Sequence, residues 1–146
     1  MKRESPPPRE RFPYLAEMTT RWLDNDVYGH VNNVAYFSYF DSTVNRFLIE
    51  RGGLDTRNGP TIGVIVESKC NYAQPLAYPE SLEVGVCVEH LGTRSVRYGV
   101  GVFKKGSPTA AAWGYLVHVF VGREALQPEP IPATLRLALQ SIPPPA

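Results

Sequence analysis

A change of hydrophobic period near residue 52 restricts the possible folds more than any other feature of this sequence. Before it, apolar side chains recur at steps of three and four residues, the spacing of one helix face; they are Phe37, Phe40, Val44, Phe47 and Leu48. Asn32 or Asn33 can cap the start of this segment, and Gly52-Gly53 can end it. The pattern predicts a long helix over residues 33–51, about 27 Å in length.

After residue 52 the period becomes two, which indicates β-strands whose alternate side chains face a core. The strand-like segments span residues 62–72, 82–88, 96–102 and 111–121, with an earlier strand over 14–22 and a short helix over 132–140. One face of the first long segment is expected to carry Ile62, Val64, Val66, Ser68, Cys70 and Tyr72. Short connections favour antiparallel hairpins, so the chain is expected to have an α+β fold.

Four strand glycines lie opposite the valine-rich positions: Gly85, Gly99, Gly101 and Gly114. Glycine weakens a strand, so its repetition suggests that something approaches the sheet closely there. A central helix wrapped by the antiparallel sheet would explain these positions. Ordinary bulges and twist would explain them equally well.

The composition limits the domain organisation. At 146 residues, 43% of them hydrophobic and 20% charged, the chain has the size and composition of one globular domain. Residues 1–13 and 142–146 are rich in proline and are expected to be disordered tails, which leaves residues 14–141 as a single domain. Cys70 and Cys87 lie in strand-like segments without metal-ligand spacing, and two reduced thiols are expected rather than a disulfide.

The charge and hydropathy also limit the partners. A net charge of +1 gives no strong field toward nucleic acid or an anionic membrane, so neither is expected as a partner. No apolar run approaches the roughly 20 residues of a membrane span. The N-terminus lacks the apolar region of a signal peptide. A cytoplasmic location follows as the default expectation.

Polar residues with the chemistry for acyl transfer crowd into the ten positions before the long helix: Asp24, Asp26, His30, Asn32 and Asn33. A helix start offers unpaired N–H groups and the positive end of the macrodipole, which would polarise a thioester carbonyl. A carboxylate just upstream could attack that carbonyl or activate a water. The competing interpretation of Asp26 is a cap or turn residue.

A calcium loop is the other interpretation of the Asp24-x-Asp26 spacing. Tyr28 occupies the fifth position of such a loop, where an oxygen ligand is expected, and Ala35 occupies the twelfth, where a bidentate glutamate is needed. The sequence therefore excludes an EF-hand site, and no metal site is expected.

The run from Arg21 to Tyr36, with the core Asp-Val-Tyr-Gly-His-Val-Asn-Asn, closely resembles the signature of the 4-hydroxybenzoyl-CoA thioesterase-like family of the hotdog-fold superfamily. The likeness continues through residues 72–82 and 91–95 and covers roughly residues 14–140. It implies a hotdog fold, in which an antiparallel sheet wraps a long central helix. It also implies hydrolysis of acyl-CoA thioesters, or acyl-carrier-protein thioesters in plant-type relatives, without a metal or redox cofactor.

The resemblance also implies roles for individual residues. Asp26 matches the catalytic carboxylate, which acts as nucleophile or as general base, and the backbone N–H near Asn33 matches the group that holds the carbonyl. His30 is either structural or a direct participant, and Asp24 is expected to end the first strand or orient the loop. Tyr28 stands where carrier-protein enzymes have an asparagine, which disfavours a carrier-protein substrate. Family active sites lie at the interface of homodimers, which often pair into tetramers.

Four further residues are candidates for substrate binding. Tyr36 could line the acyl pocket or belong to the core, and Glu67 could supply a second carboxylate or be an ordinary polar strand residue. Arg94 and Ser95 are candidates because they follow the family's Leu-Gly segment. The Arg94 side chain could bind the phosphates of CoA or belong to a solvated strand edge that charge protects from pairing. A hotdog dehydratase is a weaker alternative, because the helix has no histidine. A non-catalytic acyl-binding protein of the same fold is the remaining alternative.

Overall fold

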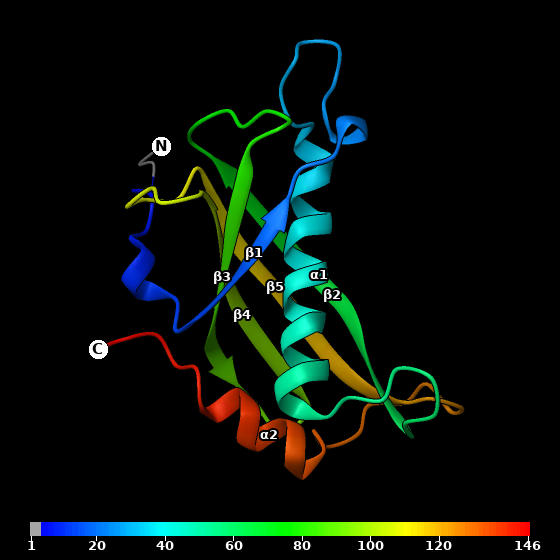
Figure 1. Cartoon of the computed structure of the whole chain (residues 1–146). Helices are drawn as coiled ribbons and strands as arrows, with labels where there is room; N and C mark the ends of the chain where they lie inside the picture. The colour runs from blue at the N-terminus through cyan, green and yellow to red at the C-terminus, as the bar shows by residue number, and fades with distance from the viewer. Residues whose placement is uncertain (1–3) are drawn as a thin grey trace.

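The computed structural model describes residues 4–146 as one curved antiparallel sheet that packs around a long helix (Figure 1). The sheet order is β1-β3-β4-β5-β2. The strands are β1 (Tyr14–Thr19), β2 (Thr61–Tyr72), β3 (Ser81–Leu91), β4 (Ser95–Lys104) and β5 (Ala112–Gly122). The helices are α1 (Asn33–Gly52) and α2 (Ala133–Gln140), and short 3-10 turns lie at Arg9–Arg11 and Trp22–Asp24. This arrangement confirms the predicted α+β hotdog fold.

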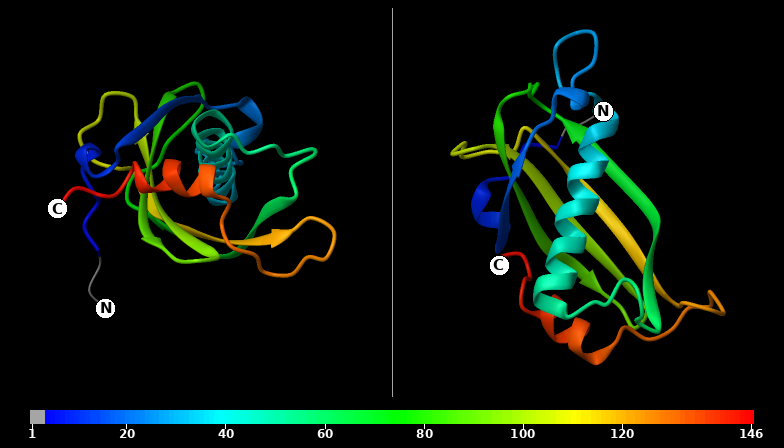
Figure 2. Two further views of the ribbon diagram at one scale, coloured as in Figure 1. Left: turned by 90° about the horizontal axis from the view of Figure 1, so that it is seen from below. Right: turned by 45° about the vertical axis from the view of Figure 1, so that its right-hand side comes forward.

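Helix α1 forms where the apolar period predicts it. The Asn32 side chain accepts a hydrogen bond from the Val34 N–H at 3.0 Å, so Asn32 is the N-cap. Gly53 ends the helix at a φ of 67°, a left-handed conformation that glycine adopts without steric cost. Seen along its axis, α1 lies in the hollow of the sheet, and α2 packs across its C-terminal end (Figure 2).

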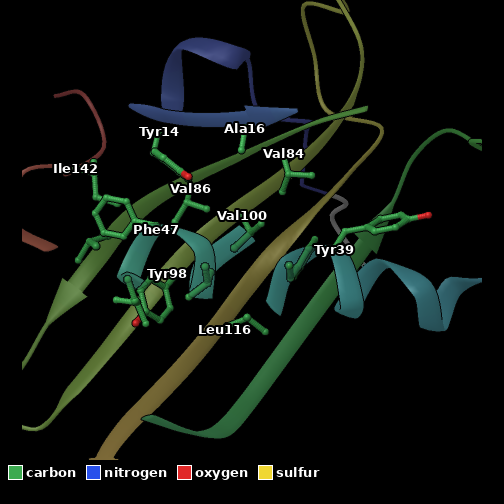
Figure 3. Close-up of a cluster of buried hydrophobic side chains, with 14 of the residues drawn as sticks. Tyr14, Ala16, Tyr39, Phe47, Val84, Val86, Tyr98, Val100, Leu116 and Ile142 are labelled. Carbon is green, nitrogen blue, oxygen red and sulfur yellow. The ribbon is translucent and has the colours of Figure 1, made fainter. Parts of the chain in front are cut away.

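The core lies between α1 and the valine-rich face of the sheet (Figure 3). From α1 it takes Phe40, Val44, Phe47 and Leu48, all fully buried. From β3 and β4 it takes Val84, Val86, Val100 and Val102, also fully buried. Burial of each large apolar side chain contributes about 1.5–3 kcal/mol relative to its exposure. The concave face of the sheet therefore holds the helix by ordinary hydrophobic packing.

Three of the four strand glycines, Gly85, Gly99 and Gly101, lie on the opposite, convex face, so the central helix does not explain them. Gly85 and Gly101 pair with each other in the β3–β4 ladder, and a Cβ on either would lie 2.6–2.7 Å from the Phe12 side chain. Phe12 packs there with Phe103 in a second, smaller core cluster. Gly114 differs, because a Cβ there would collide with the backbone of Lys69 on β2.

The packed domain extends beyond the predicted residues 14–141 at both ends. Residues 1–3 lie outside the described part of the chain, but the segment from Pro7 onward pairs with the β4–β5 connection: the Ala110 N–H donates to the Pro7 carbonyl at 3.0 Å. Phe12 is 6% exposed and therefore belongs to the domain. At the other end, Ile142 is buried and accepts a hydrogen bond from the Val88 N–H. Both ends are rich in proline, which predicts disorder, so the sequence does not reveal the packing of Phe12 and Ile142.

The alternating sequence of β2 predicts that every second side chain lies on one face along the whole strand. The structure contradicts this prediction. The pairing with β5 shifts register between Ile65 and Glu67, so Val66 occupies a β-bulge. Val64 pairs with Val119 on the convex face, whereas Ser68 pairs with Leu116 on the concave face. The extra residue thus places Ile62 and Val64 on the side opposite Ser68, Cys70 and Tyr72.

Both cysteines are free in the structure, and no helix within residues 4–146 combines the length and apolar character that crossing a membrane needs.

The buried side chain of His118 makes the stability of the fold depend on pH. It is 2% exposed on the concave face of β5, and its Nδ1 atom lies 3.0 Å from the Tyr98 hydroxyl. Burial lowers its pKa to about 4, and the nearby charge of Asp41 opposes this shift only partly. In the unfolded chain the pKa is about 6.5. Between these values the unfolded state binds more protons, so the stability that neutral His118 permits is complete above pH 6.5 and declines as the pH falls toward 4.

We expect the free energy of unfolding to fall by about 2–3 kcal/mol between pH 7 and pH 4.5 because of His118. Urea unfolding at the two pH values measures this loss. In His118→Gln, which cannot titrate, the loss between the two pH values should be clearly smaller. An equal loss in both proteins would show that other groups cause the pH dependence.

Candidate active site

The loop that carries the candidate carboxylate is anchored on both sides. The strand expected over residues 14–22 ends at Thr19, and a 3-10 turn at Trp22–Asp24 follows. Asn25 and Val31 form an isolated antiparallel bridge, the Val31 N–H donates to the Leu76 carbonyl at 2.7 Å, and Asn25 Oδ1 accepts from the Tyr78 N–H at 3.0 Å. The five residues between these anchors form an exposed turn.

Asp26 opens this turn. Its N–H donates to the His30 carbonyl at 2.9 Å, and its own carbonyl accepts from the Gly29 N–H at 3.1 Å. Gly29 has a φ of 82°, which permits the tight reversal. The Asp26 Oδ1 atom accepts a hydrogen bond from the Tyr28 N–H at 2.9 Å, an Asx-turn. Within residues 4–146 the Oδ2 atom accepts no hydrogen bond, so the carboxylate shapes the turn with one oxygen and presents the other.

The start of α1 supplies the electrophilic half of a site. The Asn32 side chain satisfies the Val34 N–H, whereas the Asn33 N–H has no hydrogen-bond acceptor among the described residues. The Asn33 carbonyl accepts from the Tyr72 hydroxyl at 2.9 Å, which ties the end of β2 to the helix start. An unpaired N–H at the positive end of a long helix can donate to a carbonyl and to the oxyanion that forms from it.

A pocket of about 350 Å³ brings the candidate residues together. Four of the seven residues expected from the sequence line it: Asp26, His30, Asn33 and Tyr36. Its other lining residues are Val31, Tyr72, Ala73, Gln74 and Pro75. Tyr36 is buried against the Tyr72 ring, with centroids 5.1 Å apart, and burial raises its pKa to about 12. Tyr36 is therefore a neutral aromatic wall at physiological pH.

Glu67 does not reach this pocket. The β2 bulge places it on the convex face opposite Val117, where it accepts a hydrogen bond from the Tyr115 hydroxyl. Within one chain Glu67 therefore does not supply a second carboxylate to this pocket. The sequence could not place Glu67, because a bulge one residue away reverses the face of each following residue.

Arg94 and Ser95 lie at the β3–β4 turn, which packs beside α2 at the far end of α1. The Ile131 N–H donates to Thr93 there, and Arg136 donates to the carbonyl of Gly92. In one chain these residues and the Asp26 pocket thus occupy opposite ends of the molecule (Figure 1). Neither residue lines the pocket that contains Asp26 within one chain.

The structure adds one contact near the candidate site that the sequence did not reveal. Asp24 is 3% exposed and accepts a hydrogen bond from the Tyr39 hydroxyl at 2.7 Å. Tyr39 comes three residues after Tyr36, so helical spacing alone could have placed it near the same end of α1. Nothing in the spacing pairs it with Asp24.

Among the described residues no three His, Cys, Asp or Glu side chains gather in a group that could hold a metal ion.

A long helix held by a curved antiparallel sheet is the architecture of the hotdog fold. The sequence profile of the Thioesterase-like superfamily matches residues 20–139. The chain belongs to this superfamily, as the signature from Arg21 to Tyr36 predicted. The family match supports thioester hydrolysis as the class of reaction.

Individual proteins show the same relationship. The chain is 26% identical over 115 residues to the uncharacterized protein YsmA of Bacillus subtilis (strain 168), covering 78% of this chain and 76% of YsmA. It is 46% identical to the PA5185 protein of Pseudomonas aeruginosa strain PAO1, whose crystal structure matches with a TM-score of 0.96 over 97% of this chain and 99% of that one. Slr0204, a 1,4-dihydroxy-2-naphthoyl-CoA thioesterase from Synechocystis, is 15% identical with a TM-score of 0.79 over 87% of this chain and 95% of that one, a likeness of fold alone.

Proposed function

We propose that this protein hydrolyses acyl-CoA thioesters to a free acid and CoA, with Asp26 as the catalytic carboxylate. The observation that carries the proposal is that a carboxylate with a free oxygen and an unpaired helix N–H line one pocket. Acyl transfer needs these two parts together: a nucleophile or base, and a donor to the developing oxyanion. The superfamily match supports the same class of reaction.

In the proposed reaction the thioester carbonyl oxygen accepts a hydrogen bond from the Asn33 N–H. Asp26 then takes one of two roles. As a nucleophile it attacks the carbonyl carbon, CoA leaves as a thiolate that takes up a proton, and water hydrolyses the resulting acyl-aspartyl anhydride. As a general base it removes a proton from a water that attacks directly, and that proton ends on the CoA sulfur. Neither route requires a metal or a redox cofactor.

The pocket walls fit an acyl group beside the reacting carbon. Tyr36 and Tyr72 form an aromatic wall, and Pro75 and Val31 add apolar surface. His30 is exposed at the rim, and its ring makes no hydrogen bond within residues 4–146. It is therefore free to contact the substrate, whereas its carbonyl has the structural task of closing the Asp26 turn at 2.9 Å.

We also propose that the active protein is a homodimer formed through β2. This strand is an edge of the sheet, and it exposes Val64 and Val66 at 40% and 58%. A long apolar edge strand is a template for pairing with another chain. Near the Asp26 turn, apolar side chains are still more exposed; they are Trp22, Leu23, Val27 and Tyr28, each at 76% or more. A second subunit would cover these surfaces and could bring its own Arg94 and Ser95 toward the site.

The β2 edge gives a test of the dimer. We expect the double substitution Val64→Lys and Val66→Lys to raise the dimer dissociation constant by about 30-fold or more, since 2 kcal/mol of lost association free energy has that effect. Sedimentation equilibrium measures it. Leu137→Lys is the matched control, because Leu137 is 69% exposed on α2. Equal dissociation constants in wild type and the β2 variant would exclude β2 as the interface.

A matched pair of substrates tests the proposed substrate class. The same acyl group is presented on CoA and on a phosphopantetheinylated carrier protein, and free thiol is followed for acetyl, palmitoyl and benzoyl groups. The proposal predicts faster hydrolysis of the CoA esters. Preference for the carrier-protein ester would favour a carrier-protein thioesterase, and binding of acyl-CoA without thiol release would favour an acyl-binding protein.

A further inference from the structure

We propose that Asp24, Tyr39 and Arg21 form a positioning unit that fixes Asp26 relative to the start of α1. This inference rests on the proposed function, in which Asp26 and the Asn33 N–H act on one carbonyl. The three residues come from the β1–α1 connection and from the second turn of α1. None of them lines the pocket that contains Asp26, so the unit acts through the backbone that it holds.

Asp24 is a buried carboxylate whose two oxygens are both occupied. The Oδ2 atom accepts from the Tyr39 hydroxyl at 2.7 Å and from the Arg21 N–H at 2.8 Å. The Oδ1 atom accepts from two nitrogens of the Arg21 guanidinium at 3.0 and 3.1 Å. Arg21 thus holds one carboxylate oxygen with two guanidinium nitrogens while its own side chain remains largely exposed. A buried charge with four donors has a single favourable orientation.

The charges of this unit are fixed at neutral pH. Burial alone would raise the pKa of Asp24, but the hydrogen bonds from Tyr39 and Arg21, with the Arg21 charge, hold that pKa below its ordinary value. Burial and the neighbouring Asp24 carboxylate raise the pKa of Tyr39 above its ordinary value. Asp24 is therefore an acceptor and Tyr39 a donor throughout the physiological range.

Asp24 controls both halves of the candidate site through short connections. Its backbone carbonyl accepts a hydrogen bond from the Asn32 N–H at 2.8 Å, and Asn32 caps α1 directly before Asn33. Two residues further along, Asp26 opens the exposed turn. Tyr39 lies at the edge of the core with its hydroxyl directed away from the valine side chains (Figure 3). That hydroxyl donates to Asp24. Movement of Asp24 would therefore move Asp26 relative to the Asn33 N–H.

Tyr39→Phe tests the inference with the smallest change, because it removes only the hydroxyl and keeps the buried ring. We expect kcat to fall by about 10- to 100-fold, the loss that follows from misplacing a reacting group by about 1 Å. KM should stay within about threefold, because the pocket walls are unchanged. Tyr98→Phe is the matched control, since it removes a buried hydroxyl that bonds to His118 and not to the loop. Asp24→Asn should lower kcat at least as far as Tyr39→Phe, because it removes the charge that both Tyr39 and Arg21 contact.

Amide hydrogen exchange gives a readout that does not depend on the substrate. Exchange across residues 25–33 should accelerate in Tyr39→Phe and stay at the wild-type rate in Tyr98→Phe. A kcat within twofold of wild type in folded Tyr39→Phe, or an equal fall in Tyr98→Phe, would overturn the positioning role. If wild type hydrolyses no thioester, the proposed function fails, and unchanged exchange across residues 25–33 would then overturn the positioning role separately.

Discussion

Replacing Asp26 by asparagine should lower kcat for thioester hydrolysis by about 1000-fold or more while leaving the protein folded. Asparagine keeps the shape of the side chain, and its amide oxygen can still accept the Tyr28 N–H that Asp26 Oδ1 accepts at 2.9 Å. What it loses is the negative charge, and with it the ability to attack a carbonyl or to deprotonate water. Steady-state assays of thiol release on the best acyl-CoA measure kcat, and thermal unfolding shows that the fold is retained.

Asp55 offers a closely matched control for this change. It also makes an Asx-turn, with its Oδ1 atom accepting from the Arg57 N–H at 3.0 Å, and it lies after the C-terminal end of α1. Asp55→Asn should therefore keep kcat within about twofold of wild type. A similar kcat in wild type and Asp26→Asn would leave Asp26 with only its role in the turn. The assignment of the catalytic carboxylate would then be wrong.

Replacing Phe12 by alanine should destabilise the protein by about 3–5 kcal/mol, the usual cost of truncating a buried phenylalanine. Phe12 is 6% exposed and packs edge-to-face on Phe103, with ring centroids 5.8 Å apart. Gly85 and Gly101 leave the room for its ring on the convex face, so no neighbouring side chain can easily fill the cavity. Urea unfolding of both proteins at one concentration measures the loss.

Leu137→Ala is the control for this stability change, because Leu137 is 69% exposed and its truncation should alter the free energy of unfolding by less than about 0.5 kcal/mol. A loss below about 1 kcal/mol in Phe12→Ala would mean that residues before β1 form a tail in solution. It would also remove the explanation for glycine at positions 85 and 101.

The long helix and the strands could be predicted from sequence because their signals are local and periodic. Apolar side chains recur at steps of three and four positions within residues 33–51, and α1 spans Asn33–Gly52. The alternating segments give β2 to β5 with boundaries near those expected. Local signals also placed Asp26 beside the helix start, because a short loop leaves little room between them. The four candidates nearest that loop accordingly line one pocket.

The errors arose where the structure depends on a single inserted residue or on distant partners. The bulge at Val66 reverses the faces of β2, and alternation in the sequence does not reveal it. The glycines at 85 and 101 are explained by Phe12, more than seventy positions earlier, in a segment whose prolines favour a disordered tail. The bulge also explains why Glu67 lies outside the pocket that contains Asp26. Arg94 and Ser95 are remote from it because antiparallel hairpins place alternate turns at opposite ends of a sheet.

The most direct test of the central claim is the rate at which purified wild-type protein releases free CoA from acyl-CoA esters, compared with Asp26→Asn in the same assay. For at least one of the acetyl, palmitoyl or benzoyl esters, kcat/KM for wild type should reach about 10⁴ M⁻¹s⁻¹, within the ordinary range of enzymes. The rate with Asp26→Asn should be close to that of buffer. Release at the buffer rate by wild type with every ester would contradict the assignment of this protein as an acyl-CoA thioesterase.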